Sequence, residues 1–393
     1  MSRHIQTSLL DPTPRAPDGF RSLAIATQRG STTLFASARD VRDDWCPERV
    51  PYAYGLHGTP TTLELAERIA LLENANHCFI TPGGQAALAL VYFAFCASGD
   101  HVLVPESAYG PNKDLAHDLL ARLGISVQTY DPMLGADIAA LIRLNTRLIW
   151  CESPGSATME VQDVPAIAAV AHEHGVVLAL DNTYGSGVFF DAFAHGVDVS
   201  IQALTKYVGG HSDLLLGSVS TRSAAHYEAL GQARSLLGMA VSPDDCSLAL
   251  RGLQTLWVRL EHLQKSTLRI AQWLKTRPEV ERVLHPALPD CPGHEFWKRD
   301  FTGSSSVFSV VFATQMAGDL LLDFIDRLAL FKIGFSWGGV TSLVAPHFNI
   351  DRDVRPYGDR LVRFNIGLEH VDDLIADLEQ AFNSNKKTKG EAQ

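Results

Sequence analysis

The stretch VVLALDNTYGSGVFFDAFAHGVDVSIQALTKYVGG, residues 176–210, decides the fold. It holds two apolar runs, 176–180 and 199–204; Asp181 directly follows the first, and Lys206 comes two residues after the second. Nearly continuous apolar runs of this length are typical of parallel strands that are covered on both faces. Because ligands collect at the carboxyl ends of such strands, the stretch predicts an α/β sheet with a functional site at one edge.

The same alternation of helical patterns and apolar runs extends over residues 61–221. The expected helices begin near Thr62, Gly84, Pro111, Asp137 and Asp163. The expected strands are 78–81, 101–104, 126–130, 146–151, 176–180, 199–204 and 214–220. This order is the pattern of parallel βαβ units, so we expect a large, mainly parallel, seven-stranded sheet.

The expected domains follow from where this alternation starts and stops. Residues 1–60 form an N-terminal arm, and residues 61–255 form the large domain. Helical periodicity over 251–263 links the large domain to a smaller α+β domain at 256–382. The last segment, 383–393 (NSNKKTKGEAQ), is polar and is expected to be a disordered tail.

Composition excludes several classes of function. The 393 residues include 33 Lys or Arg and 44 Asp or Glu, and the net charge of −11 argues against a basic nucleic-acid-binding surface. The longest apolar run, 86–97, is shorter than the ~20 residues that cross a bilayer, so we expect a buried helix and no membrane partner. The six cysteines are scattered without a CxxC pair, so structural thiols and no metal site are expected. The first 20 residues lack an apolar core, so no secretory signal is expected and the cytoplasm is the expected compartment.

Lys206 and Asp181 together indicate one kind of cofactor. A lysine in a desolvated cleft can form a Schiff base, and the hydroxyl of the neighbouring Thr205 can hold a phosphate oxygen. A carboxylate at Asp181 can keep a pyridine nitrogen protonated, which makes the ring of pyridoxal phosphate an electron sink. Taken singly, each residue also fits a simpler interpretation: Lys206 as a surface lysine, and Asp181 as a turn former or helix cap.

Two further segments fit the same cofactor. Residues 81–85 (TPGGQ) precede a helical run, so the backbone N–H groups of Gly84 and Gln85 can face a phosphate at a helix N-terminus. Tyr109 follows the run HVLVP and can stack on a cofactor ring. The alternatives are a plain strand-to-helix turn for the glycines and ordinary packing for the tyrosine.

Long blocks of the sequence carry a family resemblance. They are ESPGSATMEVQDVPAI (152–167), DVSIQALTKYVGGHSD (198–213), HPALP and GHEFWKRDFTGSS (within 285–305), SWGG (336–339) and IGLEHVDDLIADL (366–378). Over residues 27–382 the chain resembles the Cys/Met-metabolism group of pyridoxal-phosphate enzymes, and within that group the members that cleave the β carbon–sulfur bond of L-cystathionine. The resemblance implies fold type I, the aspartate-aminotransferase-like fold.

The resemblance also implies roles around the cofactor. Lys206 matches the Schiff-base lysine that takes the Cα proton, and Asp181 matches the partner of the pyridinium nitrogen. Tyr109 matches the ring-stacking tyrosine, which shares with Lys206 the protonation of the leaving sulfur. Gly84, Gln85 and Thr205 match phosphate-binding positions.

Other matches concern the substrate and the assembly. Arg363 matches the arginine that binds the substrate α-carboxylate, a bidentate task, and Ser336 contributes near it through its backbone. Tyr54 matches a tyrosine that reaches the phosphate and substrate in the neighbouring subunit. The resemblance therefore implies a homotetramer, built as a dimer of dimers that share active sites.

Four positions bear on how well the pattern holds. Trp337, in SWGG, is typical of the β-acting members and not of γ-acting relatives, although it also fits a core tryptophan. Leu56 stands where the family commonly has a phosphate-binding arginine, and the adjacent His57 cannot reproduce a bidentate guanidinium. Ala203 and Phe335 replace an expected serine and tyrosine.

The function implied is that of a carbon–sulfur lyase that converts L-cystathionine to homocysteine, pyruvate and ammonia in transsulfuration and methionine biosynthesis. Two enzymatic alternatives stay open: a γ-acting relative, such as a cystathionine γ-lyase or a sulfhydrylase, and a broad cysteine-S-conjugate β-lyase. A third alternative is a non-catalytic binding protein that has kept the fold.

Overall fold

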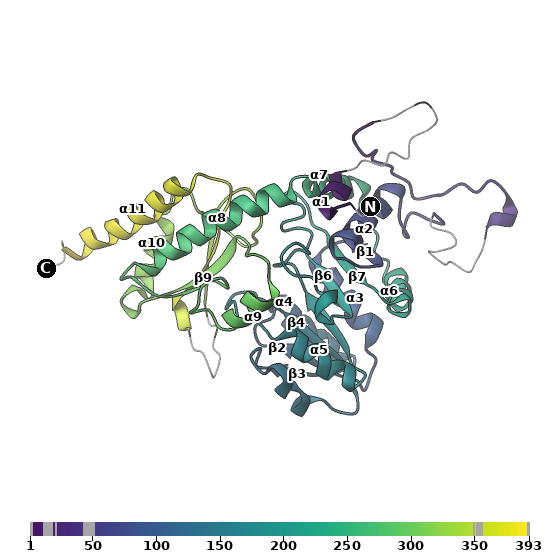
Figure 1. Cartoon of the computed structure of the whole chain (residues 1–393), viewed down its shortest axis with the longest axis horizontal. Helices are drawn as coiled ribbons and strands as arrows, with labels where there is room; N and C mark the ends of the chain where they lie inside the picture. Colours follow the sequence, from purple (N-terminus) through teal and green to yellow (C-terminus); the bar gives the residue numbers. More distant parts are fainter. Residues whose placement is uncertain are drawn as a thin grey trace.

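The chain folds into two domains joined by the long helix α8 (Leu256–Lys275), as Figure 1 shows. The computed structural model describes residues 3–10, 19, 22–41, 52–348, 350 and 357–390, with side chains as far as residue 383. α8 follows α7 (Pro243–Leu253), and residues 254–255 separate the two helices.

The large domain is built on a seven-stranded sheet. Its strands are β1 (His77–Thr81), β2 (His101–Pro105), β3 (Ser126–Tyr130), β4 (Thr146–Glu152), β5 (Val177–Asp181), β6 (Val199–Gln202) and β7 (Gly217–Thr221), in the order β1-β7-β6-β5-β4-β2-β3. Neighbouring strands from β3 to β6 are parallel, and β7 is antiparallel to both β1 and β6. The prediction of a mainly parallel seven-stranded sheet in an α/β domain is therefore confirmed.

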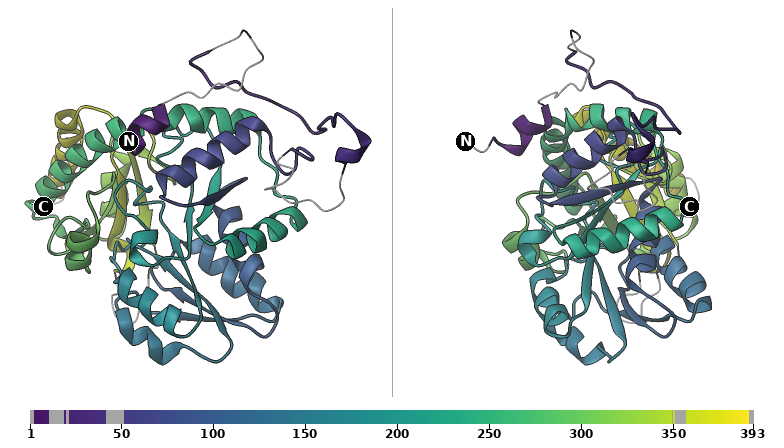
Figure 2. Two further views of the ribbon diagram at one scale, coloured as in Figure 1. Left: turned by 45° about the vertical axis from the view of Figure 1, so that its right-hand side comes forward. Right: turned by 90° about the vertical axis from the view of Figure 1, so that its right-hand side faces the viewer.

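Both faces of this sheet are buried, which explains the continuous apolar runs. In β4, Leu148 and Trp150 enter the core on one face, and Ile149 and Cys151 enter the core on the other. The first face packs against α3 (Gly84–Phe95) and α6 (Ala224–Leu236), and the second against α2 (Pro60–Leu72), α5 (Val164–Glu173) and α7. Figure 2 shows helices on either side of the sheet.

Local sequence signals set the helix starts. Thr59 caps α2, whose first residue is Pro60, and the Asp163 side chain caps α5. The helix expected near Pro111 is α4 (Gly110–Asp114), which continues as a π-helical turn over Leu115–Leu120. The α-helix expected near Asp137 is instead a 3-10 helix, Gly135–Leu141, which begins at Gly135 with a φ of +52° and ends four residues before β4.

The small domain has a five-stranded sheet in the order β10-β11-β12-β9-β8. Its strands are β8 (Val280–Leu284), β9 (Val307–Phe312), β10 (Lys332–Ile333), β11 (Leu343–His347) and β12 (Leu361–Asn365), and its other helices are α9 (His294–Asp300), α10 (Asp319–Asp326) and α11 (Val371–Gly390). An aromatic core holds sheet and helices together; the rings of Phe324 and Phe382 stack with centroids 4.4 Å apart.

The two ends of the chain differ from the body. The arm carries α1 (Ile5–Leu10), and residues 22–41 run outward from the large domain in Figures 1 and 2, where Ile25 packs against the core and Gln28 N–H donates to Thr61 Oγ1. At the other end α11 continues to Gly390, so most of the segment for which disorder was expected is helical, since a helix once formed propagates readily through polar residues. Residues 391–393 lie outside the described part.

Two remaining findings concern membranes and thiols. Among the described residues, no helix is long and apolar enough to cross a membrane. Cys78, Cys96, Cys151, Cys246 and Cys291 carry free thiols, and Cys46 lies outside the described residues.

Candidate active site

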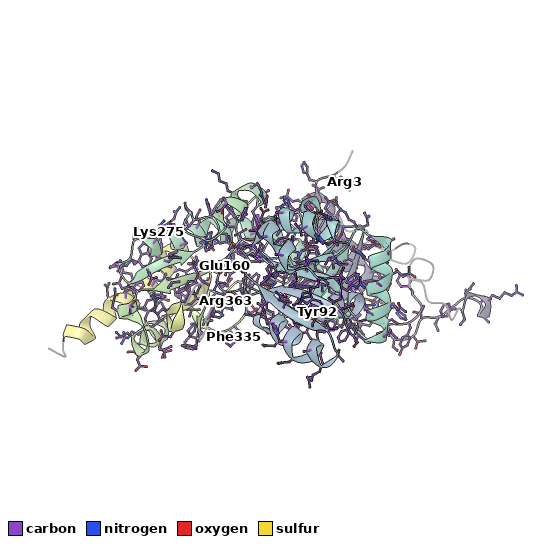
Figure 3. The ribbon with its side chains drawn as sticks, turned by 90° about the horizontal axis from the view of Figure 1, so that it is seen from below. Arg3, Tyr92, Glu160, Lys275, Phe335 and Arg363 are labelled. Atoms are coloured by element: carbon purple, nitrogen blue, oxygen red, sulfur yellow. The ribbon has the colours of Figure 1, made fainter. Side chains whose placement is uncertain are left out.

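A cavity of about 1100 Å³ lies where the carboxyl ends of β4, β5 and β6 meet the small domain. Nine of the ten predicted site residues line it: Gly84, Gln85, Tyr109, Asp181, Thr205, Lys206, Ser336, Trp337 and Arg363. Figure 3 shows Arg363 at the junction of the two domains, with Phe335 beside it. The fold thus brings together, from distant parts of the chain, residues that were predicted separately.

Lys206 lies in the turn between β6 and β7. Its backbone N–H donates to Ala203 O at 3.0 Å, and its Nζ donates to Ser336 Oγ at 2.7 Å. Burial, reinforced by the charge of Arg363 and opposed by that of Asp181, lowers the pKa of the Lys206 amine to about 8. A substantial fraction of this amine is therefore neutral near physiological pH, as a nucleophile or base requires.

Asp181 ends β5 and is held by its own turn. Its Oδ1 accepts hydrogen bonds from the backbone N–H of Thr183 at 3.0 Å and from the Thr183 hydroxyl at 2.5 Å. Burial raises the pKa of this carboxyl, while the Thr183 hydrogen bonds and the charge of Lys206 partly oppose that rise. A cationic ring nitrogen is the partner that would favour the ionised form of such a carboxyl.

Glu152 is a site residue that the sequence analysis missed. It ends β4 directly opposite Asp181 in the parallel register, and its Oε2 accepts the backbone N–H of Tyr109 at 2.7 Å. Burial and the neighbouring Asp181 raise the pKa of the Glu152 carboxyl well above its ordinary range. The signal that would have found it is the one used for Asp181, a carboxylate immediately after an apolar run.

The turn from β1 into α3 forms a cradle for an anion. Gly83 has a φ of +149°, and a Cβ on Gly84 would lie 2.8 Å from the Ala203 Cβ, so the backbone comes close to the lysine turn only because Gly84 has no side chain. The first N–H groups of α3 have no acceptor within the helix, which suits a phosphate. Thr205 lines the cavity, but its hydroxyl already bonds with the backbone of Leu216, at 3.1 and 3.2 Å.

The SWGG segment forms the opposite wall. Ser336 and Gly338 have φ angles of +80° and +81°, and Gly338 N–H donates to Asn365 Oδ1 at 2.9 Å. A Cβ on Gly338 would lie 3.0 Å from the backbone carbon of Lys206, so this turn rests directly on the lysine turn. It places the Trp337 ring 5.4 Å from Lys206 Nζ.

Arg363 and His347 extend from the small sheet. Arg363 on β12 is opposite Ala345 of β11, and His347 lies two residues further along the same face of β11. Both residues line the cavity. Burial and then the charge of Arg363 lower the pKa of His347 to about 4, so its ring is neutral at pH 7. The sequence analysis missed His347, because nothing in the sequence marks its register beside Arg363.

These residues fit pyridoxal phosphate. A lysine of lowered pKa and the half-buried carboxyl of Asp181 face one cavity, and the glycine cradle that a Cβ would fill opens beside them. Ala203 and Phe335, two of the departures from the expected pattern, line the same cavity. Tyr54 does not: it is 52% exposed and forms an isolated bridge with Thr32 in the arm.

Comparison with known proteins agrees with this geometry. The chain is 46% identical to a putative cystathionine beta-lyase of Rhizobium johnstonii. The 357 aligned residues cover 90% of this chain and 89% of the relative. It is 44% identical to the cystathionine beta-lyase MetC of Escherichia coli, over 84% of this chain and 85% of the relative. A crystal structure of cystathionine gamma synthase from Xanthomonas oryzae pv. oryzae, in complex with aminoacrylate and cysteine, superimposes with a TM-score of 0.90 at 27% identity and covers 99% of this chain and 100% of that chain.

The family model described as Cys/Met metabolism PLP-dependent enzyme matches residues 6–383. The predicted family, the fold type I architecture and pyridoxal phosphate as the cofactor are therefore confirmed. With its lysine, its carboxyl and its glycine cradle in one cavity, the chain belongs to the Cys/Met-metabolism family of pyridoxal-phosphate-dependent enzymes.

Proposed function

We propose that this chain is a carbon–sulfur β-lyase that cleaves L-cystathionine to homocysteine, pyruvate and ammonia. The observation that carries the proposal is the position of Trp337, 5.4 Å from Lys206 Nζ, in the same cavity as Arg363. The side chain that distinguishes β-acting members thus lies next to the amine that handles the proton. The identities of 46% and 44% to proteins named cystathionine beta-lyase support the same choice.

Each wall of the cavity has a task in this reaction. Arg363 binds the α-carboxylate of the substrate through its guanidinium fork and so orients the Cα–H bond. Lys206, with its pKa of about 8, removes that proton as the neutral amine, and Ser336 Oγ at 2.7 Å holds the amine in place. When bound, pyridoxal phosphate supplies an electron sink for the charge left at Cα.

The carbon–sulfur bond then breaks at Cβ, and the sulfur leaves with the bonding electrons as homocysteine. Lys206, now protonated, or Tyr109 returns a proton to that sulfur. Tyr109 is 43% exposed at the N-terminus of α4, and Glu152 fixes its backbone. The remaining three-carbon fragment takes up water and yields pyruvate and ammonia, which balances the reaction.

The proposal includes a homotetramer in which Tyr54 reaches the active site of the neighbouring subunit. Tyr54 lies in the arm, half exposed and outside the cavity of its own chain, as a residue that serves another subunit would. Analytical ultracentrifugation of the holoenzyme tests this part: we expect a tetramer, and a monomer that retains full activity would contradict it.

The decisive test is product identity. The purified enzyme is incubated with L-cystathionine, and the keto acid and the thiol are identified by mass spectrometry, with S-substituted cysteines as parallel substrates. Pyruvate with homocysteine is the expected pair. 2-Oxobutyrate with cysteine would assign the chain to the γ-acting alternative, and faster cleavage of simple S-substituted cysteines would assign it to the cysteine-S-conjugate β-lyases. A colourless protein that binds no pyridoxal phosphate would indicate a non-catalytic protein.

A further inference from the structure

A buried arginine lies behind the arm segment that carries Tyr54. Arg234, on α6, is 2% exposed, and its Nη2 donates to the backbone oxygen of Leu56 at 3.2 Å. Its Nε donates to Ile80 O at 3.4 Å, and its guanidinium lies 5.5 Å from the ring centroid of Phe79. The guanidinium thus contacts the very residue at which an arginine was expected and a leucine was found.

The charge of Arg234 has no carboxylate partner in the described part of the chain. A second buried arginine, Arg68, pairs with Glu64 at 2.8 Å, whereas the hydrogen bonds of Arg234 within the described residues go to backbone oxygens. A buried cation without an opposite charge is costly, and an anion near it would offset that cost.

His57, the other candidate to replace the missing arginine, does not supply that charge. His57 and Arg234 line a second cavity of about 220 Å³. Burial and then the charge of Arg234 lower the pKa of His57 below its ordinary value of 6.5, so the imidazole is neutral near pH 7. The positive charge at this turn therefore belongs to Arg234.

We propose that Arg234 supplies from α6 the guanidinium charge that Leu56 lacks, and that it positions the Tyr54–Leu56 turn against the phosphate of the cofactor in the neighbouring subunit. This inference rests on the proposed sharing of active sites between subunits. Arg234 lines the second cavity and not the one around Lys206 in its own chain, and its hydrogen bond to Leu56 O ties it to the turn of Tyr54, the residue proposed to serve the neighbouring subunit. It is a positioning residue, whose charge reaches the phosphate through the turn that it holds.

The test compares two ligands that differ only in the phosphate. Cofactor-free wild type, Arg234→Met and Arg234→Lys are titrated with pyridoxal phosphate and with pyridoxal, and dissociation constants are measured from visible absorbance. For Arg234→Met we expect affinity for pyridoxal phosphate to fall about 10-fold, because the turn that carries Tyr54 loses a charge-assisted hydrogen bond, and affinity for pyridoxal to stay within about twofold. Arg234→Lys keeps the charge, so its affinity for pyridoxal phosphate is expected to lie between that of the wild type and that of Arg234→Met.

Arg222→Met is the matched control. Arg222 also donates from Nε to a backbone oxygen, that of Asn74 at 2.7 Å, and lies 5.3 Å from a phenylalanine ring, but it is exposed and does not contact the Tyr54 turn. We expect it to leave both affinities unchanged. A purely structural role of Arg234 would weaken pyridoxal and pyridoxal phosphate by the same factor, and that result, or no change at all, overturns the proposal. If Arg234→Met does not fold, the losses of affinity for pyridoxal phosphate and for pyridoxal are compared in Arg234→Lys instead.

Mixed subunits test the crossing of the boundary. In a dimer of one Lys206→Ala chain and one Arg234→Met chain, the site that keeps Lys206 receives Arg234 from its neighbour, so tight covalent capture of the cofactor should return. Failure to return would contradict the assignment across subunits. The comparison of affinities for pyridoxal phosphate and pyridoxal does not depend on catalysis. A wild type that prefers pyridoxal phosphate but does not cleave cystathionine would refute the proposed function and leave the role of Arg234 intact.

Discussion

The two walls of the cavity are built in different ways. The wall from the large domain consists of residues at the ends of neighbouring parallel strands: Glu152 ends β4, Asp181 ends β5, and Lys206 lies in the turn that follows β6. The wall from the small domain consists of a glycine turn at 336–339 and of Arg363 on an antiparallel strand. The first wall follows from a general rule of parallel sheets. The second exists only because the small domain packs against the first.

The join between the walls shows what this packing achieves. Lys206 Nζ bonds to Ser336 Oγ across 130 residues of sequence, and Gly338 rests on the backbone of Lys206. The charge of Arg363 also contributes to lowering the pKa of the Lys206 amine. The large domain therefore supplies the reactive group, and the small domain tunes and orients it. The predictions below disturb one wall, the other or the join.

The largest effect is expected in the wall from the large domain. Lys206→Ala should lower turnover by about 10³-fold or more, because one amine both holds the cofactor covalently and moves the Cα proton. Noncovalent binding of pyridoxal phosphate should remain, since the cradle at Gly84 is untouched. Turnover and cofactor content measure the two effects; near-wild-type activity would refute the role of the lysine.

In the wall from the small domain, Arg363→Lys should raise KM for L-cystathionine about 100-fold, because a point charge replaces a bidentate fork. Arg360→Lys is the control: Arg360 precedes β12 and pairs with Glu281 at the surface, away from the cavity. Steady-state kinetics of both variants check this. Equal values of KM in the two variants would contradict the placing of the α-carboxylate at Arg363.

The join is broken most directly at Gly338. Gly338→Ala should lower kcat about 10- to 50-fold and destabilise the protein by about 2 kcal/mol, since the new methyl group meets the backbone of Lys206 at 3.0 Å. Gly318→Ala shares the positive φ, +67° against +81°, but its Cβ would meet nothing within 4 Å. Thermal unfolding and kcat are measured for both variants. An effect of positive φ alone appears in both, whereas an effect of the contact between the two walls appears in Gly338→Ala alone.

Glu152 sharpens the comparison within the wall from the large domain. Glu152→Ala removes the acceptor of the Tyr109 N–H and should lower kcat/KM about 10-fold. Glu152→Gln keeps an acceptor of the same shape and should lose about threefold or less. If the glutamine variant is as impaired as the alanine variant, the charge of Glu152, and not its anchoring of Tyr109, is what matters.

The smallest effect is a change of pH profile. Neutral Lys206 captures the cofactor, so the rate of capture by the cofactor-free enzyme should rise with pH and level off above the pKa of about 8. Between pH 7.5 and 8.5 the neutral fraction grows about threefold, whereas a lysine of ordinary pKa near 10.4 would gain about tenfold over that unit and continue to gain. Stopped-flow absorbance distinguishes a lysine with the lowered pKa from one with the ordinary pKa. In Arg363→Lys the pH profile should be unchanged, because the positive charge near Lys206 is kept.

The seven strands, the positions of Asp181 and Lys206 behind them, and the family could all be predicted from the order of the residues. These are local properties: continuous apolar runs mark strands buried on both faces, and the residues that follow them reach one edge of the sheet. Even Glu152 was within reach of that argument. The residues of the small domain entered only through the resemblance, since an arginine within an antiparallel strand has no local mark of function.

Which groups meet, and how their contacts change them, depends on the folded chain. It brought Ser336 to the lysine, put His347 next to Arg363 and set Arg234 behind the turn of Leu56. It also lowered the pKa of Lys206, because desolvation and neighbouring charges depend on distances between segments that lie far apart in the chain. Residue order fixes which strand ends share an edge, whereas burial and charge at the site depend on how the two domains close upon each other.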